Sequence, residues 1–585
     1  MPFAVKKNGS FTACRIVEKD NPDSEQKCHM VLHLRVLNKS PSEYINKFLM
    51  KKIIYFVLIF VFFVLMSACS ILQPYSIKKI TPSIPEEYRE KVLESLEEAG
   101  SNKRELLKVL HHYKDDPKKL EAASFLIAYM PDHYFADVGL VDSLGNPVPL
   151  NVMDFNTALE VQTHIDSLEK ELGELHYKLI EKREDVKTMS SHLLMTHIDM
   201  AFLAYETLPW TNKYNWDDFK EYILPYRGSS EPLSNWRLYF WYLFPADRDS
   251  AKDPLQLAYA INDSSKKMFT FKEVFYYHPA DQGLDEMLKN GYGRCEDMTN
   301  FTIYAMRANG LAVTSDFTPY WPDRSNNHAW NSIILPDGKV IPFMGAEANP
   351  GQYNLQEKIA KVYRKLFSQE KNTLADVLPD SMKAPPWLGY KNFKDVTDKY
   401  VQVSDVTVQV YKDDPFAYIA VFNDNDWQPI HWGSVDSLRN VTFSNMGRNI
   451  AYLPVFYEVV DSIMVENEKK PDYEPVPAGA PFILSGEGYI ASFDNKRIDF
   501  RNEIDSAFVM KQTGHGGVNK VKIDSTYTWF VWAEDEWQEI IDTTATTDSL
   551  VFDYYYPESL YKVEEECLHP DPRIFTVEDG EVIFW

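Results

Sequence analysis

A single cysteine, Cys295, stands in a context that favours nucleophilic chemistry. It follows Gly293-Arg294, and the apolar residues after it recur at every third or fourth position, which predicts a helix over 296–309. Unpaired backbone N–H groups and the helix dipole favour a negatively charged sulfur at such an N-terminus. A histidine, His328, opens a strand-like run 33 residues later. A cysteine at a helix start with a histidine beside it is how a thiolate nucleophile is generated.

Short strands and turns around this pair indicate how it is positioned. Residues 312–318 and 326–335 are typical of strands, and Pro336-Asp337-Gly338 is a tight turn before a returning strand at 339–343. His328 therefore heads a hairpin, which we expect to pack on the helix that begins at Cys295.

These motifs, in this order, resemble the transglutaminase-like superfamily, whose fold is papain-like. The resemblance covers 265–365, under a fifth of the chain. It rests on Gly293-Arg294-Cys295 with Asp297, on His328-Ala329-Trp330 and on the Pro-Asp-Gly hairpin. It implies that Cys295 is the nucleophile and that His328 is the base of a thiolate–imidazolium pair.

The third catalytic residue is where the sequence departs from the family. The resemblance implies an acid on the strand after the histidine hairpin, and Met344 stands at that position. Glu347, three residues further on, is our candidate for the orienting acid. Asn331 and Asp316 are weaker candidates. Without an orienting group, the imidazole would be held less firmly and activity would be low or absent.

The oxyanion hole has one natural donor, the backbone N–H of Cys295. Gln282 and Asn290 are weak candidates for a second donor, and Trp330 is a weak candidate for a substrate contact. No His, Cys, Asp and Glu residues have metal-ligand spacing, and no glycine-rich phosphate loop is present. We therefore expect a reaction without metal or cofactor.

Residues 50–68 have the pattern of a signal peptide: Met50-Lys51-Lys52, an apolar run over 53–66, then small residues before Cys69. We expect Met50 to be the initiator and 1–49 to be upstream sequence; the alternative is a signal-anchor helix with a short N-terminal tail. The end of the segment resembles a bacterial lipobox. That resemblance implies that Cys69 carries lipid and that the chain is anchored to a membrane without spanning it.

The expected location is the bacterial cell envelope, lipid-anchored at the outer membrane. The residues after Cys69 are not an acidic run, so the periplasmic face is favoured over the cell surface. Of five cysteines, Cys14 and Cys28 precede the signal and Cys69 would carry lipid, which leaves Cys295 and Cys567. A disulfide between these two is the alternative explanation of Cys295.

The charge of the chain argues against nucleic acid as a partner. The net charge is −25; residues 1–68 carry ten Lys and Arg against five Asp and Glu, so the remainder carries 51 against 81, a net −30. An acidic protein of this kind has no electrostatic footprint for nucleic acid or an anionic membrane surface. The sequence gives no indication of the oligomeric state.

The pattern along the chain indicates an α+β protein: a papain-like transglutaminase core, preceded by a helical region and followed by β-sandwich-like modules. Within the helical region a heptad seam at 161–179 predicts a helical hairpin. The aromatic residues crowded at 210–242 are expected to be mostly core, with some lining a groove. The predicted segments are a doubtful leader (1–49), the signal (50–68), a tether (69–85), the helical region (86–270), the transglutaminase-like core (271–365), a linker (366–395) and two β modules (396–485 and 486–585).

The function expected from these features is thiol-dependent hydrolysis or acyl transfer at amide bonds of peptides, proteins or glycopeptides. One alternative is a transglutaminase-like fold that has lost its chemistry and binds a peptide or glycan. In that case Trp427, His431 and Trp432 would stack on sugar rings, although such residues more often fill a sandwich core. Another alternative is a structural envelope lipoprotein whose β modules dock to a partner.

Overall fold

The computed structural model describes residues 75–465, 468–493, 508–511, 521–552, 556, 558–565 and 572–585. The predicted leader and signal, the lipidation site Cys69 and the second candidate for a disulfide, Cys567, lie outside these residues. No helix within the described part is long and apolar enough to cross a membrane. Contacts divide the chain into two units, Met1–Lys79 and Ile80–Trp585, and the second unit contains all of the described strands.

The helical region is held together by apolar faces and by capped helix starts. Four of the ten residues of α4 are buried, and all four are Leu or Val. The Asp116 side chain accepts the backbone N–H of Lys119 at 3.1 Å and so caps α5. The helices of this region are α3 (Glu86–Glu98), α4 (Lys103–His112), α5 (Pro117–Tyr129), α7 (Asp185–Thr188), α8 (Ser191–Thr207), α9 (Trp216–Tyr222), α10 (Trp236–Leu243), α11 (Pro245–Ser250) and α12 (Pro254–Ser265).

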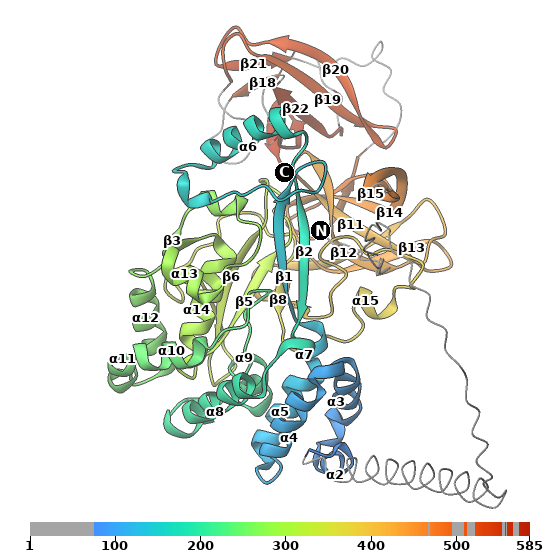
Figure 1. Ribbon diagram of the computed structural model, residues 1–585. Helices are drawn as coiled ribbons and strands as arrows, with labels where there is room; N and C mark the ends of the chain where they lie inside the picture. Colours follow the sequence, from blue (N-terminus) through green and yellow to red (C-terminus); the bar gives the residue numbers. More distant parts are fainter. Residues whose placement is uncertain are drawn as a thin grey trace, which may run out of the picture. The chain divides into compact units, whose positions relative to one another are not determined.

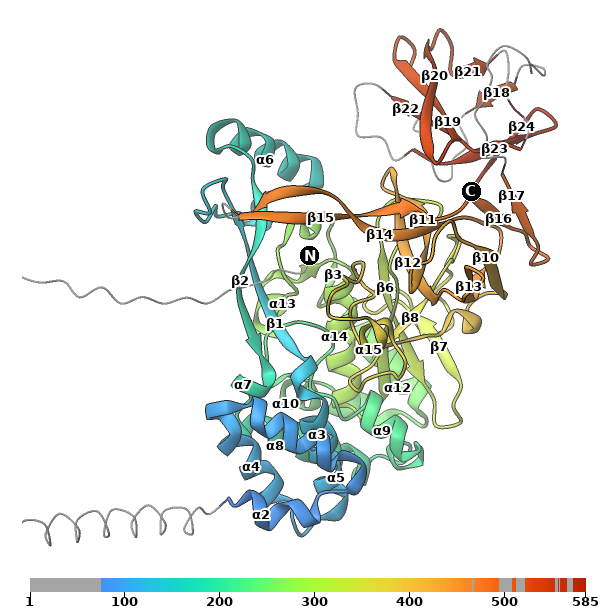
Figure 2. The same cartoon turned by 90° about the vertical axis from the view of Figure 1, so that its right-hand side faces the viewer.

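The predicted helical hairpin over 161–179 is wrong. Helix α6 (Ala158–Leu172) ends at Gly173, whose φ of 81° lies outside the helical region and suits a residue without a side chain. The seam then continues into strand β2 (His176–Glu184), which pairs antiparallel with β1 (Tyr134–Val141). The β1–β2 ribbon runs between the α3–α5 helices and α6 in both views (Figures 1 and 2).

A central helix and an antiparallel sheet form the next part of the chain. Helix α14 (Cys295–Ala308) is buried along almost its whole length and packs on strands β5 and β6 (Figure 1). Within the described residues this sheet has the order β7-β6-β5-β8-β9. Its strands are β5 (Ala312–Thr318), β6 (His328–Ile334), β7 (Val340–Phe343), β8 (Tyr363–Lys365) and β9 (Phe393–Asp395).

A short parallel strand pair and one helix precede α14. Strand β3 (Thr270–Phe271) pairs in parallel with β4 (Tyr292–Gly293), and α13 (Leu284–Asn290) connects them. The predicted linker 366–395 is not a free connection, because its last residues form β9 and pair with β8. The short helix α15 (Leu374–Val377) lies in the same segment.

Two β modules follow, as the alternating pattern indicates. In the first, β10 and β13 pair with each other, and the other strands form a sheet with the order β12-β11-β14-β16-β17, to which β15 adds on β14. It extends to Ser492, beyond the expected boundary at 485. Its strands are β10 (Val403–Gln409), β11 (Phe416–Asn423), β12 (Asp426–Ser434), β13 (Asn440–Gly447), β14 (Ile450–Val465), β15 (Glu468–Pro477), β16 (Phe482–Leu484) and β17 (Ile490–Ser492).

The described strands of the second module surround a core of their own, which includes Trp529 and Phe575. Strand β18 (Phe508–Lys511) pairs with β21 (Ser549–Phe552). The larger sheet has the order β20-β19-β22-β23-β24, made of β19 (Thr526–Ala533), β20 (Glu536–Thr544), β22 (Tyr561–Glu565), β23 (Phe575–Glu578) and β24 (Glu581–Phe584).

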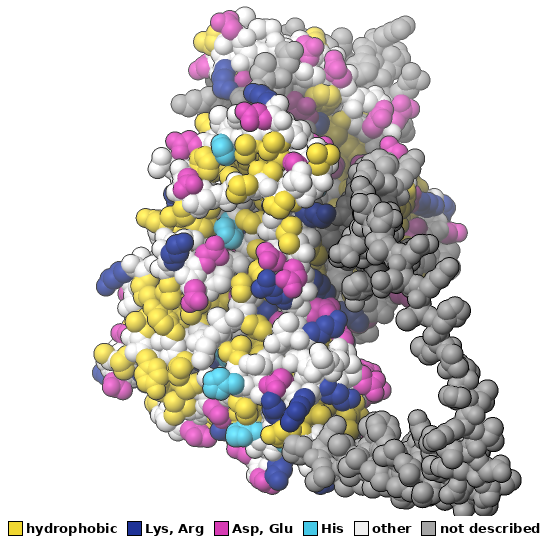
Figure 3. Space-filling view, in the orientation of Figure 1, with side chains coloured by type: hydrophobic (Ala, Val, Ile, Leu, Met, Phe, Trp, Pro, Cys, Tyr) yellow, Lys and Arg dark blue, Asp and Glu magenta, His cyan; other side chains and the backbone are white. Residues whose placement is uncertain are grey.

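Most of the aromatic residues at 210–242 are core residues. Trp210 and Trp236 are almost fully buried, and Trp236 stacks on Tyr304 of α14. Tyr239 and Tyr242 of α10 are exposed. Figure 3 shows hydrophobic side chains gathering over the α10–α12 helices, at the lower left of that face.

Candidate functional site

The start of α14 is fixed by a buried carboxylate. Asp297 accepts the backbone N–H of Arg294 at 3.1 Å and that of Gln282 at 3.0 Å. The Gln282 side-chain amide donates to Asp297 Oδ2 and to the Tyr292 carbonyl, both at 3.0 Å. Burial raises the pKa of Asp297 to about 6, against the opposing charge of Arg294. This network ties the loop before Cys295 to the first turn of the helix.

The weak oxyanion and substrate candidates take part in packing. Both amide protons of Gln282 are engaged in the network at Asp297, and Asn290 Nδ2 donates to Gln282 Oε1 at 2.9 Å. Trp330 is fully buried, and its indole N–H donates to Tyr400 Oη at 3.0 Å. The remaining candidate for an oxyanion donor is the backbone N–H of Cys295, which lies in the first turn of α14.

Cys295 lies beside the strand that carries His328. The backbone N–H of Ala329 donates a hydrogen bond to the sulfur, which lowers the thiol pKa. The S–H group donates to Glu296 Oε2 at 3.1 Å. Burial, with only 2% of the side chain exposed, and the charge of Glu296 together outweigh the opposing effects and raise the pKa of Cys295 well above its ordinary value.

His328 is held by aromatic residues. Its Nε2 lies 2.7 Å from Tyr353 Oη, and its ring stacks on Trp321 with centroids 6.1 Å apart. Burial lowers the pKa of His328, although the charges of Glu296 and Glu357 oppose this. These two shifts favour a neutral thiol and a neutral imidazole at rest, in place of the thiolate–imidazolium pair that the resemblance implies.

Glu347, our candidate for the third residue, is exposed in the turn after β7. The structure gives it no hydrogen bond to His328; instead its charge contributes to raising the pKa of Tyr353. Met344 is buried, and its backbone pairs with Ala348. The group that contacts the imidazole is Tyr353, which sequence reasoning missed because it stands in an irregular loop 25 residues beyond His328.

A comparison with protein-family models finds a match at residues 246–344, to the transglutaminase-like superfamily. This stretch is a transglutaminase-like domain within the chain. The match contains both Cys295 and His328 and ends at Met344, so Tyr353 lies outside it. It supports a general cysteine-protease-like fold for this domain. No curated protein sequence matches the chain.

The sheet of the transglutaminase-like domain contains a buried ion pair that supports the histidine strand. Arg364 donates to both oxygens of Asp316, at 2.8 and 2.7 Å. Tyr400 Oη lies 2.5 Å from the same carboxylate and also receives the indole N–H of Trp330. Trp330 stacks on Trp321, the residue that covers His328. Both carboxylate oxygens of Asp316 are thus engaged by neighbouring side chains, and Asp316 supports the structure of the sheet.

Asn331, the remaining candidate, and Arg294 of the cysteine motif also have structural partners. Asn331 Nδ2 donates to the Thr299 carbonyl of α14 at 3.2 Å, which joins the histidine strand to the cysteine helix. Arg294 donates to Asp281 at 2.9 Å and to the His278 carbonyl at 3.1 Å. Its charge is therefore shared with Asp281 and only weakly favours a thiolate at Cys295. No group of three His, Cys, Asp or Glu side chains within the described residues could hold a metal ion.

Replacing Glu296 with glutamine is expected to accelerate alkylation of Cys295. The substitution removes a negative charge 3.1 Å from the sulfur, so the thiol pKa falls. A tenfold gain in thiolate is partly offset by lower nucleophilicity, which leaves about a threefold gain in rate per pKa unit. The measurement is the iodoacetamide rate at pH 7 with peptide mapping. Asp285→Asn, at an exposed position on α13, is the control and should leave the rate unchanged.

Proposed function

We propose that the transglutaminase-like domain performs thiol-dependent hydrolysis or acyl transfer at amide bonds of peptides, proteins or glycopeptides. The observation that carries this proposal is the placement of the Cys295 sulfur at the N–H of Ala329, the residue after His328, whose Nε2 is held by Tyr353. A nucleophile next to the strand that carries a base, with a third group holding that base, is the arrangement of covalent acyl transfer.

The neutral resting pair determines the order of events. In the proposed mechanism His328 keeps a proton on Nε2, which donates to Tyr353 Oη, and accepts the thiol proton at Nδ1 as the sulfur attacks the carbonyl carbon. The carbonyl oxygen becomes an oxyanion at the Cys295 backbone N–H. The C–N bond then breaks, the imidazolium returns its proton to the leaving amine, and a thioester is left. Water or a second amine attacks the thioester and restores the thiol.

Half-exposed aromatic side chains near the cysteine support a peptide or glycopeptide substrate. Phe271, Tyr276 and Tyr292 are 41%, 44% and 39% exposed, unlike the buried aromatics of the helical region. Tyr276 is close enough to the site for the charges of Cys295 and Glu296 to act on its hydroxyl. Together with burial, they raise the pKa of Tyr276 to about 12. Aromatic faces in such a position contact apolar side chains or sugar rings.

The test is incubation of the full chain with a mixture of peptides and cell-wall glycopeptides, followed by mass spectrometry. Hydrolysis adds one water to the products, whereas transfer to an amine joins two peptides. Either product should form with the natural chain and be lost in Cys295→Ala. Equal product yields in both proteins would contradict the proposal.

Tyr353→Phe is expected to slow acylation of Cys295 by p-nitrophenyl acetate by roughly tenfold to a hundredfold. The change removes the hydroxyl 2.7 Å from His328 Nε2, and loss of orientation costs rates of this order. Glu347→Gln is the matched control, because Glu347 is exposed and acts only at a distance. A larger loss in Glu347→Gln than in Tyr353→Phe would restore Glu347 as the third catalytic residue.

A non-catalytic binding protein is the alternative function, and the burial and high pKa of Cys295 favour it. The first β module gives it less support. Trp427 is buried, with its ring against Phe422 and Trp532, and His431 contacts Tyr363 Oη at 3.0 Å. A glycan would not reach Trp427. We further propose lipid anchoring at Cys69 in the bacterial envelope, from the lipobox-like sequence alone.

A further inference from the structure

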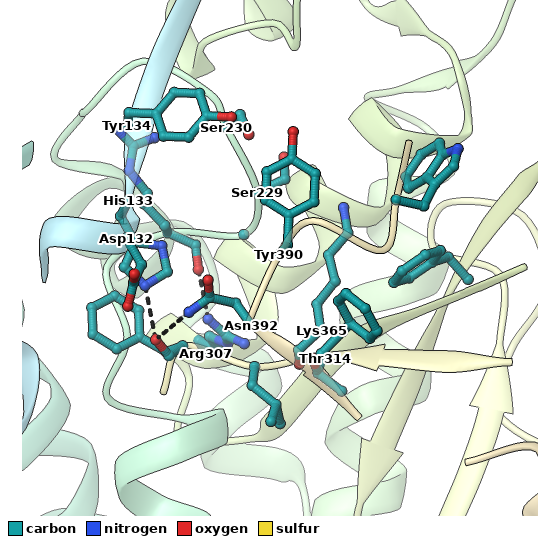
Figure 4. A pocket seen from close by; sticks show the side chains of 17 residues that line it. Asp132, His133, Tyr134, Ser229, Ser230, Arg307, Thr314, Lys365, Tyr390 and Asn392 are labelled. Carbon is teal, nitrogen blue, oxygen red and sulfur yellow. Dashed lines mark hydrogen bonds between the residues drawn. The ribbon is translucent and has the colours of Figure 1, made fainter. Parts of the chain in front are cut away.

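A cavity of about 220 Å³ lies beyond the set of Cys295, His328 and Tyr353 (Figure 4). Its walls come from four separate segments: the start of β1, the loop 227–230, strand β5 with the end of α14, and the chain around β8 and β9. An engineered cavity of about 150 Å³ holds a benzene molecule. The space here is therefore suited to a single ring with a short polar substituent.

One wall of this cavity is aromatic. Phe317, Phe393 and Trp387 form a cluster on the sheet, and the rings of Phe317 and Trp387 have centroids 5.5 Å apart. Trp387 has a φ of 70°, in the left-handed region that bulky side chains rarely adopt. Backbone strain of this kind is concentrated at ligand clamps and active sites. The chain thus holds the indole at the cavity against the preference of its own backbone.

The polar wall includes the ammonium group of Lys365. Figure 4 shows the Lys365 ammonium extending from the sheet toward Tyr390 and Ser229. Lys365 forms no ion pair within the described part of the chain, and its charge acts on Asp281 only at a distance. The oxygens of Asp281 are already engaged, one by Arg294 at 2.9 Å and the other by Ser229 at 2.5 Å.

The other charged residues of the wall are hydrogen-bonded to protein partners. Arg227 forms a bidentate pair with Asp185, with both contacts at 2.5 Å. Arg307 donates to the carbonyls of Val313 and Arg227 at 2.8 and 2.7 Å. Asp132 accepts the Gln369 amide at 2.7 Å. Asp185 cancels the charge of Arg227, and Arg307 and Asp132 carry opposite charges within the same wall, so Lys365 leaves this wall with one net positive charge.

We propose that this cavity binds a small aromatic monocarboxylate, with its ring against Trp387 and Phe317 and its carboxylate on Lys365. Ser230 and Tyr390, which interacts with Tyr134, also place hydroxyl groups at the cavity. One cation matches one carboxylate. A phosphate dianion would bring a second charge close to Asp281, which disfavours it.

The experiment is calorimetric titration of the full chain with benzoate, phenylacetate and 3-phenylpropanoate, and with 3-phenylpropanamide as the uncharged analogue. At least one carboxylate should bind, and the amide should bind about tenfold or more weakly, because its neutral carbonyl accepts a weaker hydrogen bond from the Lys365 ammonium than a carboxylate does. Failure of all three carboxylates to bind at millimolar concentration, or equal binding of 3-phenylpropanoate and its amide, would overturn the proposal.

Substitutions of single residues test whether the carboxylate binds in this cavity. Lys365→Met keeps the apolar stem and should weaken carboxylate binding about tenfold or more, whereas Lys365→Arg should retain it. Lys371→Met, at an exposed position, is the matched control. Unchanged binding in Lys365→Met would refute the site. Cys295→Ala should leave the affinity unchanged, so that this result and the test of amide-bond chemistry are independent.

Discussion

His328→Gln is expected to slow acylation of Cys295 by p-nitrophenyl acetate about 100-fold to 10,000-fold, the range that general base catalysis contributes. The effect is large because the Cys295 thiol is protonated at rest, through burial and the charge of Glu296. Attack therefore requires a base at the moment of reaction. Glutamine fills a similar space and keeps a polar group toward Tyr353, but it cannot accept the proton. The measurement is the stopped-flow burst of p-nitrophenolate.

The matched control is His278→Gln. His278 contacts the Ala280 carbonyl at 2.7 Å and Glu286 at 3.1 Å, and it has no contact with the sulfur. Its replacement should change the burst rate less than threefold or so, far below the range for a base. Equal effects of the two substitutions would show that loss of local structure, and not loss of a base, explains the result.

The pH dependence of acylation follows from the direction of the His328 shift. Neutral imidazole is the active form of the base, and burial lowers the pKa of His328 below its ordinary value of 6.5. The burst rate should therefore stay high as the pH falls through 6.5 and decline only at lower pH. A decline centred above pH 6.5 would contradict the burial of a neutral histidine.

Arg364→Met is expected to lower the free energy of unfolding of the transglutaminase-like domain by about 3–5 kcal/mol, the cost of breaking a buried ion pair from one side. Asp316 is fully buried and would keep only the hydroxyl groups of Tyr400 and Ser332. The measurement is urea denaturation followed by tryptophan fluorescence.

Lys399→Met provides the comparison for this substitution. Lys399 pairs with Asp398 at 2.7 Å, but both side chains are largely exposed, so the loss should stay below about 1 kcal/mol. Arg364→Met with no more effect than Lys399→Met would mean that the Asp316 pair does not support the strand of His328.

Local patterns in the sequence were sufficient to place the cysteine and the histidine. The helix predicted over 296–309 is observed as Cys295–Ala308, and the strand predicted over 326–335 is observed as His328–Ile334. Apolar spacing and a Pro-Asp-Gly turn act over a few residues, so they can be read without knowledge of the fold. The family match at 246–344 agrees with the resemblance to the transglutaminase-like superfamily.

Contacts between distant residues could not be predicted in this way. Tyr353 reaches His328 from a loop without periodicity, and Arg364 meets Asp316 across 48 residues. The direction of the Cys295 pKa shift has a related cause. The helix start favours a thiolate locally, but burial by the whole domain reverses that preference. At 161–179, a heptad pattern continued past Gly173 although the helix ended there.

The central claim is that Cys295 accepts an acyl group with the help of His328. The most direct measurement is acid quenching of the full chain after brief exposure to p-nitrophenyl acetate, followed by peptide mapping of the acetyl group. We predict one acetyl thioester on Cys295 in the natural chain, and much slower appearance of that adduct in His328→Gln. Absence of the adduct from Cys295, or its equally fast formation in both proteins, would contradict the account.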